Sequence, residues 1–264
     1  MKDIRFEGVG KAFPTRQGGE FVALRDITLT VAEREFVAVV GPSGSGKTTL
    51  MRMAAGLDHP THGTVRVGGR EVTGPGPDRA VVFQQFALFP WKTVRENIAF
   101  GLRCKGTPRA RQEEVVARYL RLMSMEGTED RFPHQLSGGM QQRVAIARSY
   151  AIEPDVLLMD EPFGALDAQT RTVMQEELIR LSRHEPRTVL FITHAVEEAV
   201  YLADRVVVLA RNPGRLREIV DIRPTREAED WSARPIDEVM DLPSFNHLRT
   251  HVWRLLRDQI RPDD

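Results

Sequence analysis

The chain has 264 residues, and its 37 lysines and arginines balance 37 aspartates and glutamates, so its formal net charge is zero. This length allows one large domain or a domain with an additional lobe, and the neutral balance disfavours non-specific binding to nucleic acid. The single cysteine, Cys104, excludes an internal disulfide and is typical of a reducing compartment. No apolar run approaches the roughly 20 residues that span a bilayer, and the strand-like start MKDIRFEGVG lacks a leader pattern, so we expect membrane contact only through a partner.

Strand patterns dominate the first forty residues. VALRDITLTV, residues 22–31, alternates apolar and polar side chains, and EFVAVV, residues 35–40, is a short run of the buried type. The segment GPSGSGK then interrupts the strand, and TTLMRMAAGL, residues 48–57, continues as a helix. Two further short strands bounded by glycine or proline are predicted at 63–69 and 79–84.

A helical block comes next, and after it strands and helices alternate. From about Pro90 to Pro154 the apolar residues recur at helical spacing. Strands are then predicted at 155–160, 188–193 and 205–210, and helices at 168–182 and 195–203. This alternation predicts a parallel sheet with crossover connections. We therefore expect one domain over residues 1–221, into which a helical lobe is inserted at about 90–152.

Residues 222–264 form a predicted C-terminal extension. The segment IRPTREAEDWSARPIDEVMD, residues 222–241, is charged and contains prolines, so we interpret it as linker-like. In the SFNHLRTHVWRLL segment that follows, Phe245, Leu248, Val252 and Leu255 recur at helical spacing. We expect this amphipathic helix to dock on the body of the domain rather than on a membrane surface.

The segment after the second strand matches the P-loop pattern in full. It comprises Gly41, Pro42, Ser43, Gly44, Ser45, Gly46, Lys47 and Thr48, followed by Thr49. Glycines let the backbone curl so that successive N–H groups face phosphate oxygens. We expect Lys47 to reach the terminal phosphates of a nucleotide and Thr48 to offer its hydroxyl to Mg²⁺. The alternative is a glycine-rich turn that binds nothing, which leaves the lysine and the threonine unexplained.

Two adjacent carboxylates end the strand DVLLMD. Carboxyl ends of parallel strands carry the site in open α/β sheets, so we expect Asp160 to hold Mg²⁺, through water, and Glu161 to act as the general base on the attacking water. Neighbouring residues of a strand point to opposite faces, so the strand must end here for both to serve. The alternative is a pair of solvated carboxylates at the start of a loop.

Several motifs occur in order along the chain: GPSGSGKT, VVFQQ, LSGGMQQR, LLMDEP, GALD and ITH. Together they resemble the nucleotide-binding subunit of ABC transporters, from about residue 3 to residue 220. LSGGMQQR beside a P-loop is the most specific of them, because few other P-loop families carry it. The connecting segments are similar to those of importer ATPases for nitrate, aliphatic sulfonates and taurine. The resemblance implies an α/β fold: a P-loop ABC cassette with a mainly parallel core sheet, an antiparallel β subdomain and an inserted α-helical lobe.

The resemblance also implies ATP and Mg²⁺ as cofactors and a role for individual residues. Phe13 would stack on adenine, with Phe21 as the competing candidate. Gln84, rather than its neighbour Gln85, would sense the γ-phosphate and Mg²⁺. His194 would contact the γ-phosphate and, with Gln84, support catalysis by the general base.

In the family's arrangement, the LSGGMQQR segment serves a second copy of the chain. Ser137, Gly138 and Gly139 would contact the γ-phosphate of an ATP bound by the partner's P-loop. Asp167 would lie at the interface between the two copies. The resemblance therefore implies a two-fold dimer with two shared ATP sites.

Some residues depart from the family's pattern or mimic another site. Ala195 follows His194 where the family usually has aspartate, and Glu33-Arg34-Glu35 replaces a more usual glycine turn. Neither change removes a group that the chemistry requires. His59 and His62 have a metal-like spacing, but they lie in the turn DHPTHG with no further ligand nearby, so we interpret them as loop residues.

The predicted function is that of the ATP-hydrolysing subunit of an importer for a small anion such as an aliphatic sulfonate, taurine or nitrate. The implied partners are a second copy, transmembrane permease subunits and, indirectly, an external solute-binding protein; no nucleic acid is expected. The implied location is the cytoplasmic face of the cell's inner membrane. The run FALFPW, residues 86–91, is expected to be part core and part groove for a cytoplasmic helix of the membrane subunit.

Two other functions compete with this prediction. Soluble ABC-type ATPases that act on nucleic acid or ribosomes usually carry two cassettes or long coiled insertions, and neither pattern occurs in this sequence. A regulatory module that binds ATP without turnover does not require Glu161, Gln84 and His194, so their presence argues against it.

Overall fold

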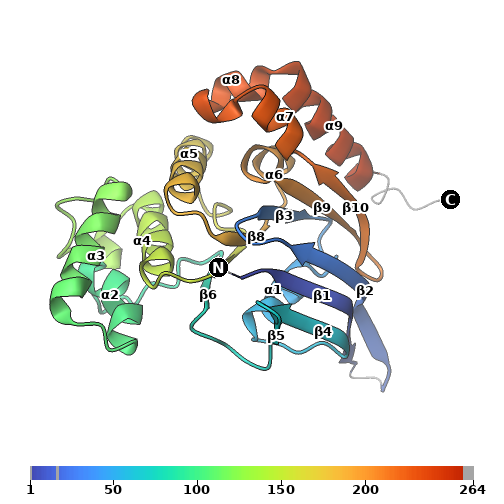
Figure 1. Ribbon diagram of the computed structural model, residues 1–264, viewed down its shortest axis with the longest axis horizontal. Helices are drawn as coiled ribbons and strands as arrows, with labels where there is room; N and C mark the ends of the chain where they lie inside the picture. Colours follow the sequence, from blue (N-terminus) through green and yellow to red (C-terminus); the bar gives the residue numbers. More distant parts are fainter. Residues whose placement is uncertain (1, 16–17, 258–264) are drawn as a thin grey trace.

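Two β-sheets and a set of helices build the molecule (Figure 1). The structure is a computed structural model that describes residues 2–15 and 18–257. The main sheet has the strand order β10–β9–β3–β8–β7–β6, and the smaller sheet has the order β2–β1–β4–β5. The strands are β1 (Ile4–Pro14), β2 (Glu20–Val31), β3 (Phe36–Val40), β4 (His62–Val67), β5 (Arg70–Glu71), β6 (Arg79–Val82), β7 (Val156–Asp160), β8 (Thr188–Ile192), β9 (Arg205–Ala210) and β10 (Arg215–Asp221). The helices are α1 (Lys47–Ala55), α2 (Val94–Cys104), α3 (Arg109–Leu122), α4 (Gly138–Ala151), α5 (Ala168–His184), α6 (Val196–Leu202), α7 (Arg223–Ala228), α8 (Ile236–Asp241) and α9 (Pro243–Arg257), with short 3-10 turns at Pro133–Gln135 and Trp231–Ala233.

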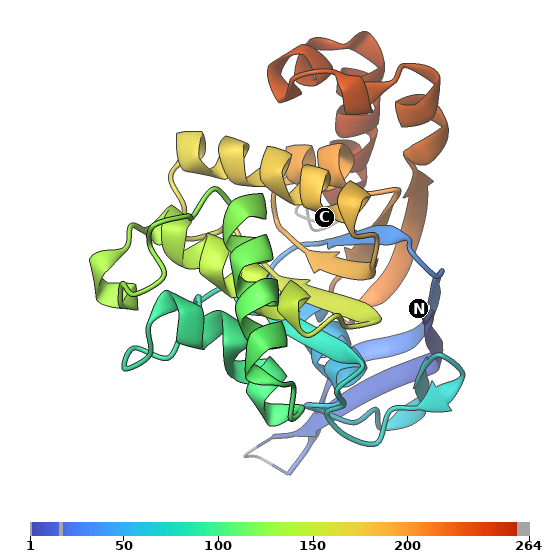
Figure 2. The same ribbon diagram turned by 60° about the vertical axis from the view of Figure 1, so that its left-hand side comes forward.

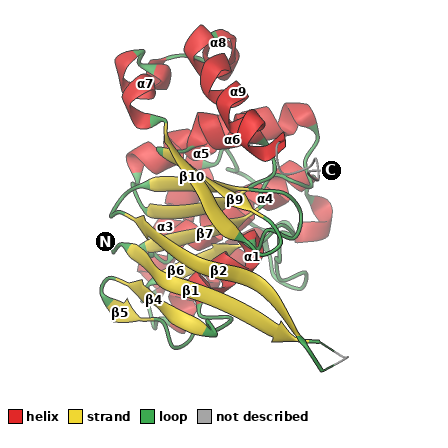
Figure 3. Ribbon diagram, turned by 90° about the vertical axis from the view of Figure 1, so that its right-hand side faces the viewer, coloured by secondary structure: helices red, strands yellow, loops and turns green. Residues whose placement is uncertain are grey.

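The main sheet is parallel from β9 to β6, and only β10 runs antiparallel to its neighbour β9. All five residues of β3 are buried, which explains why its sequence is continuously apolar rather than alternating. The smaller sheet is antiparallel throughout (Figure 3). Parallel pairing aligns the carboxyl ends of β3, β8, β7 and β6 at one edge, where the P-loop begins.

Helix α1 packs between the two sheets. Its fully buried Leu50 and Met51 join one hydrophobic core with Val39 of β3 and Leu29 of β2. Burial of side chains of this size contributes about 1.5–3 kcal/mol each. The opposite face of the main sheet is covered by helices that include α4, α6 and α9. Their buried side chains and those of the sheet form a second hydrophobic core. The start of α1 is therefore held by both sheets.

Helices α2, α3 and α4 form a lobe at one side of the main sheet (Figure 2). Val116, Tyr119 and Leu120 of α3 are buried, and so is Met123, which caps the end of the helix. Helix α2 begins at Val94 and is capped by Thr93, which forms a capping box with Glu96. Fully buried Asn97 then holds the preceding loop, because its side-chain amide accepts from the Phe89 N–H at 2.9 Å and donates to the carbonyls of Phe89, Lys92 and Thr93 at 3.0–3.2 Å.

The turn before β3 uses charged residues where a glycine turn is more usual. Arg34 adopts the left-handed conformation with φ 62°. Glu35 follows it and is buried, and its carboxylate accepts from the Ala32 N–H at 2.7 Å and pairs with Arg205 at 3.1 Å. This anchored carboxylate offsets the backbone strain of about 1 kcal/mol at Arg34.

Residues 222–241 differ from the linker-like interpretation, because they fold into α7, a 3-10 turn and α8. Trp231, Ile236 and Val239 are buried in the second core. The Arg226 guanidinium donates to Asp204 at 2.6 Å and to the Ala203 carbonyl at 2.7 Å. The charges that make the segment resemble a linker therefore attach it to the end of α6.

Helix α9 lies against α6, β9 and β10. Phe245 and Val252 are fully buried, and Leu248 and Leu255 are partly buried against the same core. The Phe245 ring packs on Trp231 with 5.6 Å between the ring centroids. Trp253, on the same helix, is 48% exposed.

Replacing the buried ring of α9 should cost far more stability than replacing its exposed one. We expect Phe245→Ala to lower the free energy of unfolding by about 3–5 kcal/mol, because it leaves a cavity beside Trp231. The matched control Trp253→Ala should stay within about 0.5 kcal/mol of the parent. Urea unfolding followed by circular dichroism measures both; equal losses would contradict the packing of α9.

Candidate functional site

The P-loop connects the end of β3 to the start of α1. Gly44 and Gly46 have φ values of 81° and 84°, in the left-handed region that favours glycine. A Cβ at Gly44 would meet nothing within 4 Å, whereas a Cβ at Gly46 would overlap the Leu24 side chain. The loop therefore curls tightly against β2, and its backbone N–H groups lie at the start of a helix, the usual place for phosphate.

Lys47 is held inside this loop. Its ammonium donates to the carbonyls of Gly41 at 2.8 Å and Pro42 at 3.2 Å, and the residue is 8% exposed. Burial lowers the pKa of Lys47, and the nearby charges of Glu161 and Asp160 act in the opposite direction. A phosphate bound in the loop would add a further negative charge close to Lys47 and so stabilise its charged form.

The two carboxylates at the end of β7 face the P-loop because the strand ends there. Asp160 is the last residue of β7, and Glu161 adopts the left-handed conformation with φ 45°. That conformation breaks the alternation of the strand. As a result the Asp160 carboxylate accepts from the Thr48 hydroxyl at 3.2 Å, and Glu161 lines the same cavity as Lys47 and Thr48.

Asp160 and Thr48 fit a magnesium site. Both offer hard oxygen ligands, which Mg²⁺ prefers, and they lie within hydrogen-bond distance of each other. Burial raises the pKa of Asp160, and the charge of Glu161 raises it further, while the hydrogen bond from Thr48 lowers it. A divalent cation would reverse the unfavourable effects by compensating both negative charges.

Two side chains from neighbouring strands flank Glu161. Gln84 follows β6 and its Nε2 donates to the Glu161 carboxylate at 3.4 Å. His194 follows β8 and its Nδ1 lies 3.3 Å from the same carboxylate. Since β8, β7 and β6 are adjacent, their carboxyl ends bring these residues to one place.

Phe13 and Phe21 are cross-strand partners in β1 and β2. Both rings line the cavity beside the P-loop. Phe13 is half-buried, with the Lys11 ammonium 4.9 Å from its ring centroid, and Phe21 is 53% exposed. Because the two residues are paired in antiparallel strands, both side chains lie on the same face of the sheet, and both stay candidates for stacking on adenine.

Ser137, Gly138 and Gly139 lie at the start of α4, apart from the P-loop. The Ser137 hydroxyl caps the helix by accepting from the Met140 N–H at 3.3 Å. A second shallow cavity there shares no residue with the first; it is lined by Ser137, Gly139, Met140, Arg143, Gln169, Thr170 and Val173. One chain therefore carries two separate groups of candidate residues.

Asp167 belongs to the second group. It caps α5 by accepting from the Thr170 N–H at 3.0 Å, and this hydrogen bonding holds the pKa of Asp167 below its usual range. Thr170 and Arg143 were not singled out from the sequence. Arg143 lies about one helical turn after Gly139, a spacing that places the two on one face of α4.

Neither a metal cluster nor a bilayer-spanning helix occurs in the described part of the chain. Within residues 2–15 and 18–257, no three His, Cys, Asp or Glu side chains cluster as a metal site would require, so His59 and His62 gain no further ligand. In the same residues, none of the helices combines the length and apolarity needed to cross a bilayer.

Comparison with known proteins identifies the family. The family described as ABC transporter matches residues 24–164, just over half of the chain. The chain belongs to the ABC transporter family. Its cassette is 51% identical over 239 residues to the nitrate import ATP-binding protein NrtD of Synechocystis sp., covering 90% of each chain. It is 42% identical to the bicarbonate transport ATP-binding protein CmpC of Synechococcus elongatus, over 98% of this chain and 38% of that protein.

A solved structure supports the same assignment. The ATP-binding cassette MJ0796, a dimer in a post-hydrolysis state bound to ADP and Pi, matches with a TM-score of 0.73 and 30% identity over 83% of this chain and 99% of that one. The predicted P-loop ABC fold is confirmed, and the chain is an ABC-type ATPase that binds ATP.

A matched pair of glycine substitutions tests the curled P-loop. Gly44→Ala and Gly46→Ala share the backbone strain of a left-handed residue, about 1–2 kcal/mol. Only Gly46→Ala also meets Leu24, so it should lose a further 1–3 kcal/mol, roughly the cost of overpacking. Urea unfolding without nucleotide measures the difference, and equal losses would contradict the close approach of the loop to β2.

Proposed function

We propose that this ABC ATPase is the energising subunit of an importer, in which two copies share two ATP sites. The observation that carries the proposal is the division of candidate residues into two groups on one chain. The P-loop group has the cradle, the metal ligands and the base, and the Ser137 group lies at the N-terminus of α4. An ATP sandwiched between copies would contact the first group of one chain and the second group of the other.

In each proposed site, Glu161 is the general base and orients the attacking water. Gln84 and His194 fix its carboxylate from two sides, at 3.4 and 3.3 Å. Lys47 neutralises charge on the terminal phosphates, and Thr48 and Asp160 would hold Mg²⁺, which supplies further charge compensation when bound. Phe13 or Phe21 would stack on the adenine.

The partner copy would complete the site. Ser137, Gly138 and Gly139 would direct the N–H groups of α4 at the γ-phosphate, and Asp167 would lie beside them at the interface. Closure would exclude bulk water from the reacting phosphate. After hydrolysis, loss of the γ-phosphate contacts would let the copies separate.

The proposed cargo is a small anion. NrtD is named for nitrate and CmpC for bicarbonate, both small oxyanions, and sulfonates and taurine remain compatible through the sequence resemblance. Selection of the anion would belong to the transmembrane permease subunits and an external solute-binding protein, with this chain bound at the cytoplasmic face of the membrane. The zero net charge disfavours the rival function on nucleic acid or ribosomes.

An aromatic patch on the lobe is the proposed contact with the permease. Trp91 is 71% exposed and packs on Phe89 at 5.8 Å between centroids, and Phe100 of α2 packs on Phe89 at 4.5 Å. Phe86 and Leu88, from the same FALFPW run, are partly buried against the core. The run is therefore divided between core and surface, and Asn97 fixes the exposed part.

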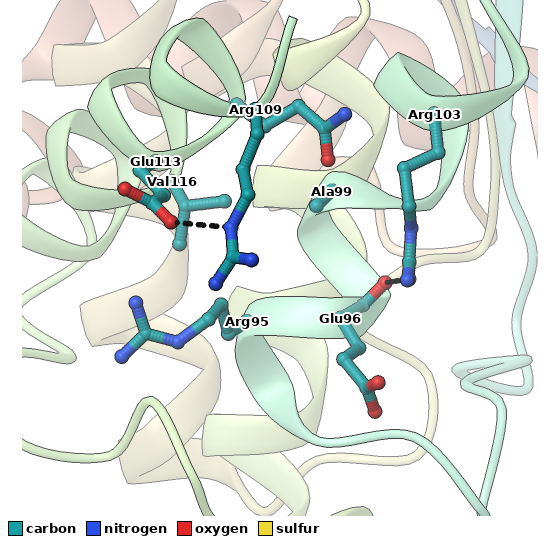
Figure 4. Close-up of a pocket in the computed structure, with 8 residues that line it drawn as sticks. Arg95, Glu96, Ala99, Arg103, Arg109, Glu113 and Val116 are labelled. Carbon is teal, nitrogen blue, oxygen red and sulfur yellow. Dashed lines mark hydrogen bonds and ion pairs between the residues drawn. The ribbon is translucent and has the colours of Figure 1, made fainter. Parts of the chain in front are cut away.

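A separate cleft lies between α2 and α3 (Figure 4). Arg95, Arg103 and Arg109 line it, and the Glu96 side chain points away because it caps α2. Arg109 pairs with Glu113 at 3.0 Å and Arg95 pairs with Asp130 at 3.6 Å, whereas the positive charge of Arg103 lies against a backbone carbonyl at 2.8 Å. This charge fits a permease helix that carries apolar residues and a carboxylate.

The shared-site mechanism predicts the behaviour of a base variant. Wild-type protein should hydrolyse ATP only with Mg²⁺, and Glu161→Gln should accumulate an ATP-bound dimer of the 29.9 kDa chain, because hydrolysis no longer releases it. Adding Ser137→Arg to that variant should restore the monomer while ATP binding persists. Size-exclusion chromatography with light scattering measures this, and a monomeric Glu161→Gln protein at high concentration contradicts the proposal.

Charges placed in the aromatic patch should separate the chain from its permease. We expect Trp91→Glu with Phe100→Glu to abolish co-purification with the membrane subunits, because a buried unpaired carboxylate is costly, and to spare ATP binding. Trp253→Glu, which adds a carboxylate at an exposed tryptophan of α9, is the control and should co-purify normally. Co-purification of the double variant at wild-type yield would rule out this surface.

A further inference from the structure

A buried polar cluster lies behind His194, outside the residues that face the nucleotide. Glu198 of α6 is 4% exposed, and its Oε1 accepts from Gln175 Nε2 of α5 at 3.0 Å. Gln175 is itself 4% exposed. Burying a carboxylate among apolar side chains costs folding free energy unless the carboxylate is hydrogen-bonded. We therefore expect a second hydrogen-bonding partner beside Glu198.

That partner is Thr193, the residue before His194. Thr193 is 2% exposed, and its hydroxyl hydrogen-bonds Glu198 and accepts from the Ala195 N–H at 3.0 Å. The hydroxyl therefore fixes the backbone on both sides of His194. Ala195 stands at the N-cap of α6 and offers no side-chain cap, so the Thr193 hydroxyl holds the turn that leads into the helix rather than capping the helix itself.

The same carboxylate faces the beginning of α5. Arg171 attracts it electrostatically, and the Arg171 guanidinium donates to the Leu166 carbonyl at 3.0 Å. Leu166 directly precedes Asp167. The cluster thus lies between the loop that carries Asp167 and the loop that carries His194, and its members Glu198, Gln175 and Thr193 are buried.

We propose that Glu198 is a positioning residue that holds His194 against Glu161 and ties this geometry to the Asp167 loop. The inference rests on the proposed function, because there Asp167 lies at the interface between copies. When the copies close, displacement of the Asp167 loop would shift Arg171 and Gln175. Because Glu198 is bonded to Gln175, its own shift would then change the position of Thr193 and of the adjacent His194. Glu198 itself lines neither of the two cavities that hold the candidate nucleotide-binding residues.

The charge state of the cluster agrees with its contacts. Burial raises the pKa of Glu198, while hydrogen bonds from Thr193 and Gln175 and the charges of Arg171 and His194 lower it. Two hydrogen-bonding side chains and two positive charges favour the ionised carboxylate, so replacing it with an amide keeps the shape and removes its charge and one acceptor.

The test compares Glu198→Gln with Glu197→Gln, which removes the neighbouring, less buried carboxylate of the same helix. We expect kcat of Glu198→Gln to fall about ten-fold or more, since small misplacement of a catalytic group is costly, with KM for ATP within about two-fold of wild type. Glu197→Gln should match wild type in both. Thr193→Val, which replaces the hydroxyl with a methyl group of similar size, should reproduce the loss if Glu198→Gln folds poorly.

A double-mutant cycle with His194→Ala separates positioning from stability. If Glu198 acts through His194, adding Glu198→Gln to His194→Ala should leave kcat unchanged, because the group it positions is gone. An equal fold-loss in both backgrounds, or wild-type kcat in Glu198→Gln and Thr193→Val, overturns the inference. Absence of ATP turnover in the wild type, or of the Glu161→Gln dimer, would instead contradict the proposed function.

Discussion

Parallel pairing of β3, β8, β7 and β6 is the constraint on which the site depends. It places four chain segments, widely separated in sequence, with their carboxyl ends at one edge. Lys47, Gln84, Glu161 and His194 meet there without any loop longer than a few residues having to reach across the molecule. The left-handed backbone of Glu161 adds the one local distortion required, because it presents two consecutive carboxylates to the same side.

Much of this arrangement could be predicted from the sequence, because the signals are local. The P-loop has its pattern between a buried strand and a helix, and Asp160 and Glu161 stand at the end of a short apolar run that predicts a buried strand. Strand order cannot be obtained from such signals alone. The motif order of a known family supplied the expectation that Gln84 and His194 lie near Glu161, and their hydrogen-bond geometry came only from the structure.

Two features that could not be predicted from the sequence, the folding of residues 222–241 and the burial of Glu198, both depend on tertiary packing. Residues 222–241 are mostly polar, and their few apolar anchors, such as Trp231 and Val239, have no strong period, so packing on α6 was not evident. Glu198 has the opposite character. Beside Glu197 in the first turn of a short helix it resembles a solvated acidic residue, and only its partners Gln175 and Thr193 reveal a buried role.

The separation of the P-loop from Ser137 on one chain has a genetic consequence. If the sites are shared as proposed, a dimer of one copy defective at Lys47 and one copy defective at Ser137 collects both defects in the same composite site. Its other site is assembled from intact halves. Two alleles, each inactive alone, would then complement each other when co-expressed, whereas two alleles that damage the same half would leave every site incomplete.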